Sequence, residues 1–148
     1  MNDPVFGLSN QNLIDVLEKH VLNSGGLIIK TGSSAVAKTV NDVYYFVAGK
    51  MYKLAAGDMT ALSGTITDGY YNVYVFAIDS DGNISTNMGT EALAVEDVVF
   101  PSTPSDEAVI GFVLVYTSGA EFVGGTTALD DGNVTDVYID ADQPMRFI

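Results

Sequence analysis

The most prominent pattern in the sequence is an unbroken apolar run over residues 108–116, AVIGFVLVY. β-branched and aromatic residues dominate the run, as is typical of β-strands. Because side chains alternate along a strand, the run would have two apolar faces. One face is expected to hold Val109, Val113 and Val115, and the other Ile110, Phe112, Leu114 and Tyr116. A strand that is apolar on both faces must be covered on both, which predicts a central place in a packed sheet or at a subunit contact.

The alternation of apolar and polar residues continues through most of the chain after residue 26. Residues 117–119 predict a turn, and residues 120–123 predict a strand that pairs back on the central run as a hairpin. Further strands are expected at residues 27–31, 35–40, 43–47, 51–54, 61–67, 70–78, 84–86, 92–94 and 135–139. Short strands at this spacing predict a mainly β protein, an antiparallel β-sandwich or barrel of about nine or ten strands.

Before residue 27 the apolar residues follow a helical period instead. Ser9 has the character of a helix N-cap, and Gly25-Gly26 that of a helix stop. The residues between them predict one amphipathic helix of roughly fourteen residues. Its apolar arc contains Leu13, Ile14, Val16, Leu17 and Val21. The predicted domains are therefore an N-terminal arm and helix, residues 1–26, and a β-sandwich, residues 27–148.

The arm before the helix has two interpretations. Residues 3–8 are either an extended docking arm, with Phe6 and Leu8 as apolar anchors, or a mobile tail.

Charge is distributed unevenly along the chain, whose formal net charge is −13. Residues 1–53 contain five basic and four acidic residues, which gives +1, whereas residues 54–148 contain fifteen acids and one base, Arg146, which gives −14. A field of this sign repels nucleic acid and anionic membranes, so neither is an expected partner. The sequence has no cysteine, and no signal peptide or membrane-spanning run is expected from it.

Several motifs resemble binding sites, and each has a simpler structural interpretation. Residues 32–39 come close to a phosphate-binding loop, but Ala37 stands where a glycine is required, and a strand is predicted to follow instead of a helix. Residues 79–83, DSDGN, begin like a calcium loop, although their glycine comes too early and Thr90 replaces the closing glutamate. We expect a hairpin turn there, with a weak cation site as the alternative. His20, the only histidine, is expected to be packed or to lie at an interface.

Two pairs of neighbouring acids, Asp106/Glu107 and Asp130/Asp131, could in principle supply the acid and the base of a glycosidase. Adjacent acids at strand ends are usually solvated, so no enzymatic activity, catalytic residue, cofactor or metal site is expected. Most aromatic side chains are expected in the core. Among them Tyr70, Tyr74 and Phe112 are candidates for self-association, because aromatic rings are enriched in interfaces.

Half of the chain resembles a known family. The segments FPSTPSDEAVIGFVLV at 100–115, FVGGTTALD at 122–130 and VYID at 137–140 resemble a recurrent C-terminal pattern in small structural proteins of tailed-bacteriophage virions. The segment YFVAGKMYKLA at 45–55 resembles an earlier part of the same proteins. The resemblance implies a non-enzymatic virion protein, most directly one that decorates or cements the outer capsid surface. The alternatives are a head fibre or tail component, or a carbohydrate- or cation-binding β-sandwich module.

The partners that this resemblance implies are the major capsid protein or other virion proteins. An acidic surface favours the outside of a shell, away from packaged DNA. The less acidic N-terminal region is then the expected capsid contact, through Phe6, Leu8, Leu13 and Leu17. Homo-oligomers are also expected, with a trimer as the assumed symmetry.

Overall fold

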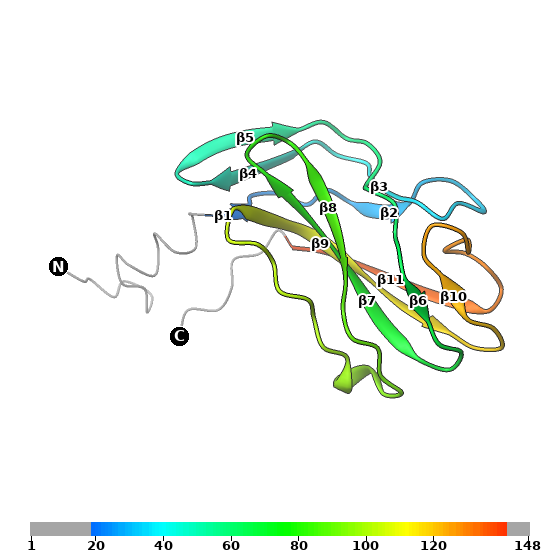
Figure 1. Ribbon diagram of the computed structural model, residues 1–148. Coiled ribbons are helices and arrows are strands. Elements are labelled where there is room, and N and C mark those ends of the chain that lie inside the picture. Colours follow the sequence, from blue (N-terminus) through cyan, green and yellow to red (C-terminus); the bar gives the residue numbers. More distant parts are fainter. Residues whose placement is uncertain (1–18, 142–148) are drawn as a thin grey trace.

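The computed structural model describes residues 19–141, which fold into a mainly β structure, as predicted (Figure 1). The strands are β1 Lys19–Val21, β2 Leu27–Ile29, β3 Ala37–Thr39, β4 Val43–Val47, β5 Lys50–Leu54, β6 Thr65–Ile66, β7 Tyr71–Asp79, β8 Ile84–Met88, β9 Glu107–Thr117, β10 Phe122–Val123 and β11 Val134–Asp140. A single turn of 3-10 helix, η2, covers Val95–Asp97.

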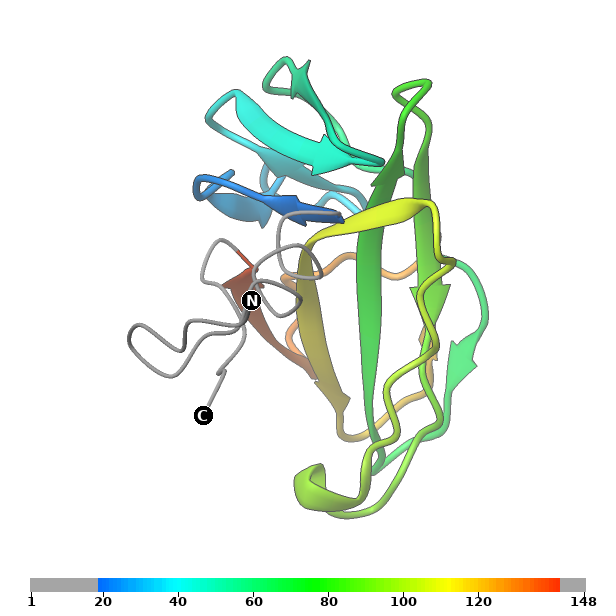
Figure 2. The ribbon, with the colours of Figure 1, turned by 90° about the vertical axis from the view of Figure 1, so that its left-hand side faces the viewer.

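Within residues 19–141 the strands pair only in antiparallel fashion and form four sheets. The largest sheet has the order β11-β9-β7-β8, and a second sheet has the order β1-β4-β5. Two-stranded sheets are formed by β2 with β3 and by β6 with β10. Figure 2 shows the three-stranded sheet lying across one end of the long strands β7 and β9. The four sheets stay separate within the described residues, so they do not close into a barrel.

The core lies between the four-stranded sheet and the smaller sheets. Its buried side chains come from every sheet, for example Tyr74 of β7, Tyr45 of β4, Leu27 of β2 and Phe122 of β10. The rings of Tyr74 and Phe122 pack with their centroids 6.1 Å apart. A shared core explains why two-residue strands such as β6 and β10 persist, because their backbone pairing alone would be too short to be stable.

The central run forms β9, as predicted, but the division of its side chains between the two faces was predicted wrongly. Ile110 joins Val113 and Val115 in the core, whereas Val109 lies outside the core cluster. The cause is a β-bulge: Ala77 pairs with Val109 and Phe76 pairs with Gly111, which leaves Ile110 as an extra residue. A bulge shifts the side-chain alternation by one position. Even-numbered residues before it and odd-numbered residues after it therefore face the same side of the sheet.

The predicted N-terminal helix is wrong at its C-terminal end. Residues 19–21 form β1, which pairs with β4 in the register Lys19↔Val47 to Val21↔Tyr45 and buries Val21. Gly25 does not stop a helix; a Cβ there would lie 2.8 Å from Thr39 Cγ2, so glycine allows two segments to pack closely. Residues 9–18, the rest of the predicted helix, lie outside the described residues.

The predicted hairpin between the central run and residues 120–123 is also wrong. Residues 122–123 form β10, which pairs with β6 through Phe122↔Ile66, while β11 takes the place beside β9. Both Phe122 and Ile66 are fully buried, so long-range packing wins over the local hairpin. Four other predicted strands are shorter in the structure: residues 27–31 become β2, residues 35–40 become β3, residues 61–67 become β6, and residues 92–94 keep only an isolated bridge between Ala92 and Tyr71.

Gly111 gives a test of the bulge and its packing. A Cβ at Gly111 would collide with the carbonyl oxygen of Ile139 and lie 2.5 Å from Leu27 Cδ1. We expect Gly111→Ala to lower the free energy of unfolding by about 1–3 kcal/mol, because an overpacked site forces backbone shifts. Urea denaturation measures the difference. Gly132→Ala is the matched control, since a Cβ placed at that position would have no atom within 4 Å; equal losses in both variants would contradict the proposed packing.

Candidate interaction surface

The side of the four-stranded sheet that faces away from the core is apolar. Strand pairing forms two rows across this side, Ile139–Phe112–Val75 and Val137–Leu114–Val73. Val73 and Val75 are buried, whereas Val137 and Ile139 at the edge of the sheet are 44% and 43% exposed. A third row adds Tyr71 and Tyr116, whose rings stack at 4.4 Å. We call Tyr71, Phe112, Leu114, Tyr116, Val137 and Ile139 the outer apolar face.

The bulge at Ile110 creates this face. Phe112 and Leu114 point outward because the alternation shifts just before them, and they meet the outward side chains of β11. Contiguous exposed apolar surface is uncommon on monomers and marks sites of interaction. The outer apolar face is therefore the main candidate for contact with another chain.

A pocket of about 490 Å³ adjoins one end of this face. It lies where the loop of residues 100–103 meets the start of β9, the start of β1 and the end of β11. Its lining residues are Lys19, His20, Val75, Phe100, Pro101, Thr103, Glu107, Val109, Phe112 and Ala141. The rings of Phe100 and Phe112 form one wall, edge to face with centroids 5.0 Å apart.

The chemistry of the pocket is mainly hydrophobic. Its ionisable lining residues are Lys19, His20 and Glu107, and the Glu107 carboxylate accepts a hydrogen bond from the Ser85 hydroxyl. No group of three or more His, Asp or Glu side chains that could hold a metal ion occurs within residues 19–141. The lining therefore combines apolar walls with one lysine and one carboxylate, which carry opposite charges.

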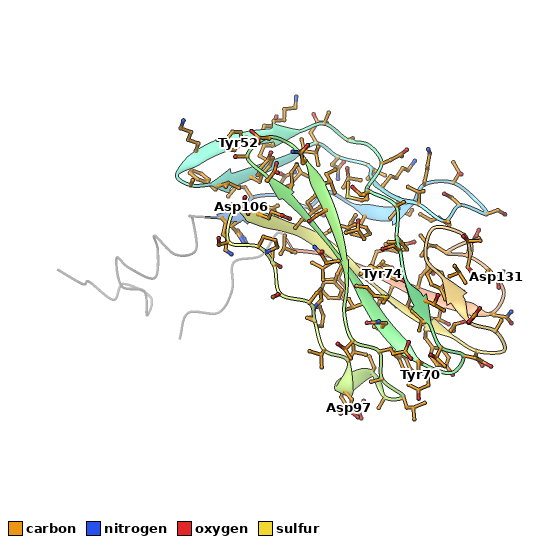
Figure 3. All side chains as sticks on the ribbon, viewed as in Figure 1. Tyr52, Tyr70, Tyr74, Asp97, Asp106 and Asp131 are labelled. Atoms are coloured by element: carbon orange, nitrogen blue, oxygen red, sulfur yellow. The ribbon has the colours of Figure 1, made fainter. Side chains whose placement is uncertain are left out.

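The structure separates the three residues predicted to mediate self-association. Phe112 belongs to the outer apolar face. Tyr70 packs at the edge of the core and stays partly exposed (Figure 3). Tyr74 is fully buried, and burial raises the pKa of its hydroxyl to about 12, so its side chain does not reach the surface. The predicted capsid contacts Phe6, Leu8, Leu13 and Leu17 lie outside the described residues.

Other candidate sites are accounted for by local structure. β3 follows residues 32–36, so a strand stands where a phosphate-binding loop needs a helix, as predicted. His20 lies half-buried in β1, opposite Phe46. Asp106 and Asp131 lie at opposite ends of the four-stranded sheet (Figure 3). Glycosidase carboxylates lie at most about 10 Å apart, so these two pairs of acids cannot act on one bond.

Several carboxylates hold loops in place, a role that the sequence analysis did not predict. Asp140 accepts hydrogen bonds from the Leu27 N–H (3.0 Å) and the Ser24 hydroxyl (2.7 Å), which joins β11 to the segment before β2. Similar bonds run from the Ser33 N–H to Asp130, from the Gly119 N–H to Asp68, from the Ala56 N–H to Asp42 and from the Thr67 N–H to Glu91. Much of the acidity of the chain therefore serves internal hydrogen bonding.

The turn at residues 79–83 uses its first acid in the same way. Asp79 accepts the N–H groups of Asp81 and Asn83, both at 2.9 Å, and the Asn83 side-chain amide at 3.3 Å. These hydrogen bonds, above all the one from the Asn83 backbone, hold the pKa of Asp79 below its usual 3.8. The expected hairpin turn is confirmed, since β7 and β8 pair on either side of it.

The pKa of Asp79 predicts how the stability of the chain depends on pH. Because the carboxyl is more acidic in the folded chain, its contribution is present above 3.8 and is lost as the pH falls through the lowered pKa. We expect Asp79→Asn to lose less thermal stability than the unmodified chain over this acidic range. Asp97→Asn, at an exposed site, matches the change in net charge. Melting curves against pH that run parallel in all three proteins would contradict the role of Asp79.

Comparison with known proteins adds no family to this description. No protein-family model matches the chain, and the searches among curated proteins and solved structures found no match either. The structure also contains, within residues 19–141, no helix with the length and apolar character needed to span a membrane. Its function is therefore inferred from its own residues.

Proposed function

We propose that this protein is a non-enzymatic structural component of a tailed-phage virion that attaches to the outer surface of the capsid as a homo-oligomer. The observation that carries the proposal is the outer apolar face, a contiguous hydrophobic surface on an otherwise acidic β scaffold. Surfaces of this kind are typical of proteins that assemble with other chains. The segments that resemble phage virion proteins, residues 100–115, 122–130 and 137–140, include most of β9 and part of β11, which supply Phe112, Leu114, Val137 and Ile139 to this face.

The electrostatic character of the chain supports an outer position. Residues 54–148 carry a net charge of −14, which would repel the phosphates of packaged DNA on the inside of a shell. The N-terminal region is close to neutral, and we retain residues 1–8, with Phe6 and Leu8, as the proposed contact with the major capsid protein. The proposed scaffold is a β-sandwich, and a trimer is its proposed state.

Two alternative functions are a different position in the virion and the binding of a small ligand. A head fibre or tail component would use the same scaffold at another position in the virion. A cation- or carbohydrate-binding module would bind a small ligand as an isolated protein. The Asp79 carboxylate already accepts three hydrogen bonds within its turn, which disfavours it as a calcium ligand.

The proposal predicts that the purified chain co-sediments with capsids built from the major capsid protein that the same genome encodes. Deletion of residues 1–8 should abolish co-sedimentation and leave the circular dichroism spectrum unchanged. Failure of the unmodified chain to bind any such capsid, or a rise in melting temperature with calcium or sugar instead, would contradict the proposal.

A separate prediction concerns the outer apolar face. Ile139→Lys should weaken self-association by about tenfold or more, because a lysine would have to be desolvated in the interface. Ser80→Lys is the matched control: it adds the same charge at an exposed position in the turn between β7 and β8, outside the outer apolar face. Sedimentation equilibrium measures both. If both variants associate like the unmodified chain, the outer apolar face is not the oligomer interface.

A further inference from the structure

We propose that copies of this chain associate head to tail, with the outer apolar face of one copy packed against the outward side of the β1-β4-β5 sheet of the next. This inference rests on the self-association in the proposed function, and it does not depend on attachment to a capsid. It identifies the second surface of the contact, which lies on a different sheet from the first.

The outward side of the three-stranded sheet is apolar and exposed. Every second residue of β4 points into the core, namely Val43, Tyr45 and Val47. Strand pairing places the other side chains in two outward rows, Leu22–Tyr44–Lys53 and His20–Phe46–Met51. Leu22, Tyr44 and Met51 are 38%, 43% and 58% exposed. We call Leu22, Tyr44, Phe46, Met51 and Lys53 the β4–β5 face.

The two sheets that carry these faces differ in charge. Residues 19–53, which contain β1 to β4 and most of β5, have five lysines and one acid, Asp42, which gives +4. Residues 54–141, which contain the whole four-stranded sheet, have fourteen acids and no base, which gives −14. Figures 1 and 2 show the blue-to-cyan strands gathered on one side of the green-to-red strands. The folded chain therefore has a basic side and an acidic side.

Lysines surround the β4–β5 face. Lys19 and Lys50 are exposed and flank Val47 at one end of the same sheet. Lys53 lies within the face and forms an ion pair with Asp42 at 3.3 Å. Both partners of that pair are about half exposed, so the lysine can still meet an acid on another molecule. The border of the β4–β5 face is therefore positive.

Acids surround the outer apolar face. The loop of residues 89–104 borders this face, because Ala92 bridges to Tyr71 and the ring of Phe100 packs on that of Phe112. The acids of this loop are Glu91, Glu96 and Asp97. Figure 3 places Asp97 and Asp106 on the acidic side of the molecule. The border of the outer apolar face is therefore negative.

Charge selects the head-to-tail arrangement over the symmetric one. Two outer apolar faces packed against each other would bring two acidic borders together, which repel. The β4–β5 face offers a comparable apolar surface with lysines at its border, so it pairs opposite charges. A contact between two different surfaces closes into a ring when the rotation between copies allows it. The proposed trimer would be a ring of three such contacts.

Complementation between two variants tests the proposal. Ile139→Lys damages only the outer apolar face, and Met51→Asp damages only the β4–β5 face. Both positions are exposed, so we expect the circular dichroism spectra and melting temperatures to match those of the unmodified chain. Head-to-tail packing predicts that each variant alone associates about tenfold more weakly or less, because every contact then includes one damaged face.

Mixing the two variants should restore one contact. The intact outer apolar face of Met51→Asp then binds the intact β4–β5 face of Ile139→Lys, and the resulting pair cannot grow, because both of its free faces are damaged. Native mass spectrometry detects this one-to-one pair, since the two substitutions change the mass differently. Thr126→Asp and Ser80→Lys are the matched controls: they add the same charges at exposed positions that belong to neither face, and each should associate like the unmodified chain.

The salt dependence of association gives a second readout. Raising the ionic strength from about 0.01 M to 0.1 M shortens the Debye length from roughly 30 Å to 10 Å. Head-to-tail association of the unmodified chain should weaken by about threefold or more over this range, because it pairs opposite charges. Association that strengthens with salt would indicate a contact between two acidic borders and would overturn the proposal.

The outcomes also separate this proposal from the proposed function. If Ile139→Lys is monomeric while Met51→Asp associates normally, the outer apolar face binds itself, which overturns the head-to-tail contact and leaves self-association standing. Absence of a mixed pair between two folded, monomeric variants would overturn it in the same way. An unmodified chain that stays monomeric would overturn both, whereas co-sedimentation with capsids tests virion attachment independently.

Discussion

The pairing of β7 with β9, interrupted by the bulge at Ile110, constrains the rest of the structure. The side chains of β7 are buried on both sides of the sheet along almost the whole strand. The neighbouring strand β9 must therefore also present apolar side chains on both sides of the sheet. In a regular strand, the side chains of all odd-numbered residues would lie on one side of the sheet and those of all even-numbered residues on the other. The extra residue allows Ala108 and Ile110 to share the core with Val113 and Val115. Phe112 and Leu114 then point outward, so the same irregularity that completes the core also builds the outer apolar face.

Close approach of the backbone fixes the position of this bulge. At Gly111 the chain passes against the Ile139 carbonyl of β11 and the Leu27 side chain of β2, where a Cβ has no room. Asp140, the next residue of β11, accepts hydrogen bonds from the Leu27 N–H and the Ser24 hydroxyl. The edge of the large sheet is thereby joined to the segment before β2. Gly111 of β9 and Asp140 of β11 therefore bring the four-stranded sheet into contact with the sheet of β2 and β3.

The sequence predicted those features that depend on neighbouring residues. The bounds of β4 and β5 were predicted almost to the residue, because the two strands and the turn that joins them are adjacent in sequence. Ala48 and Gly49 of that turn have positive φ, the conformation that a two-residue hairpin turn requires. The prediction failed where the partner strand is distant. Lys19–Val21 has helical spacing but pairs with β4, and Phe122 has a local partner available but pairs with Ile66. Tyr74 was predicted to lie at an interface. The sequence pattern of β7 does not show that both sides of this strand are covered within the same chain.

The surface was predicted less well than the strands, for two physical reasons. Net charge indicated an acidic chain, but it could not show that Asp42, Asp68, Asp130 and Asp140 also accept hydrogen bonds from backbone N–H groups of distant segments. The outer apolar face depends on a shift of one residue, which a pattern of continuous apolar residues cannot show.

The pocket and the outer apolar face share Phe112, so any occupant of the pocket must be compatible with a partner on the face. Phe112 lies in the row with Ile139, whereas Leu114 lies in the next row with Val137. Successive rows on one side of a strand are separated by two residues, about 7 Å. An occupant of the pocket would cover Phe112 from the side of Phe100 and leave the row of Leu114 and Val137 open. With the pocket filled, a partner would meet a flatter apolar surface, which is the shape that two β-sheets need in order to pack face to face.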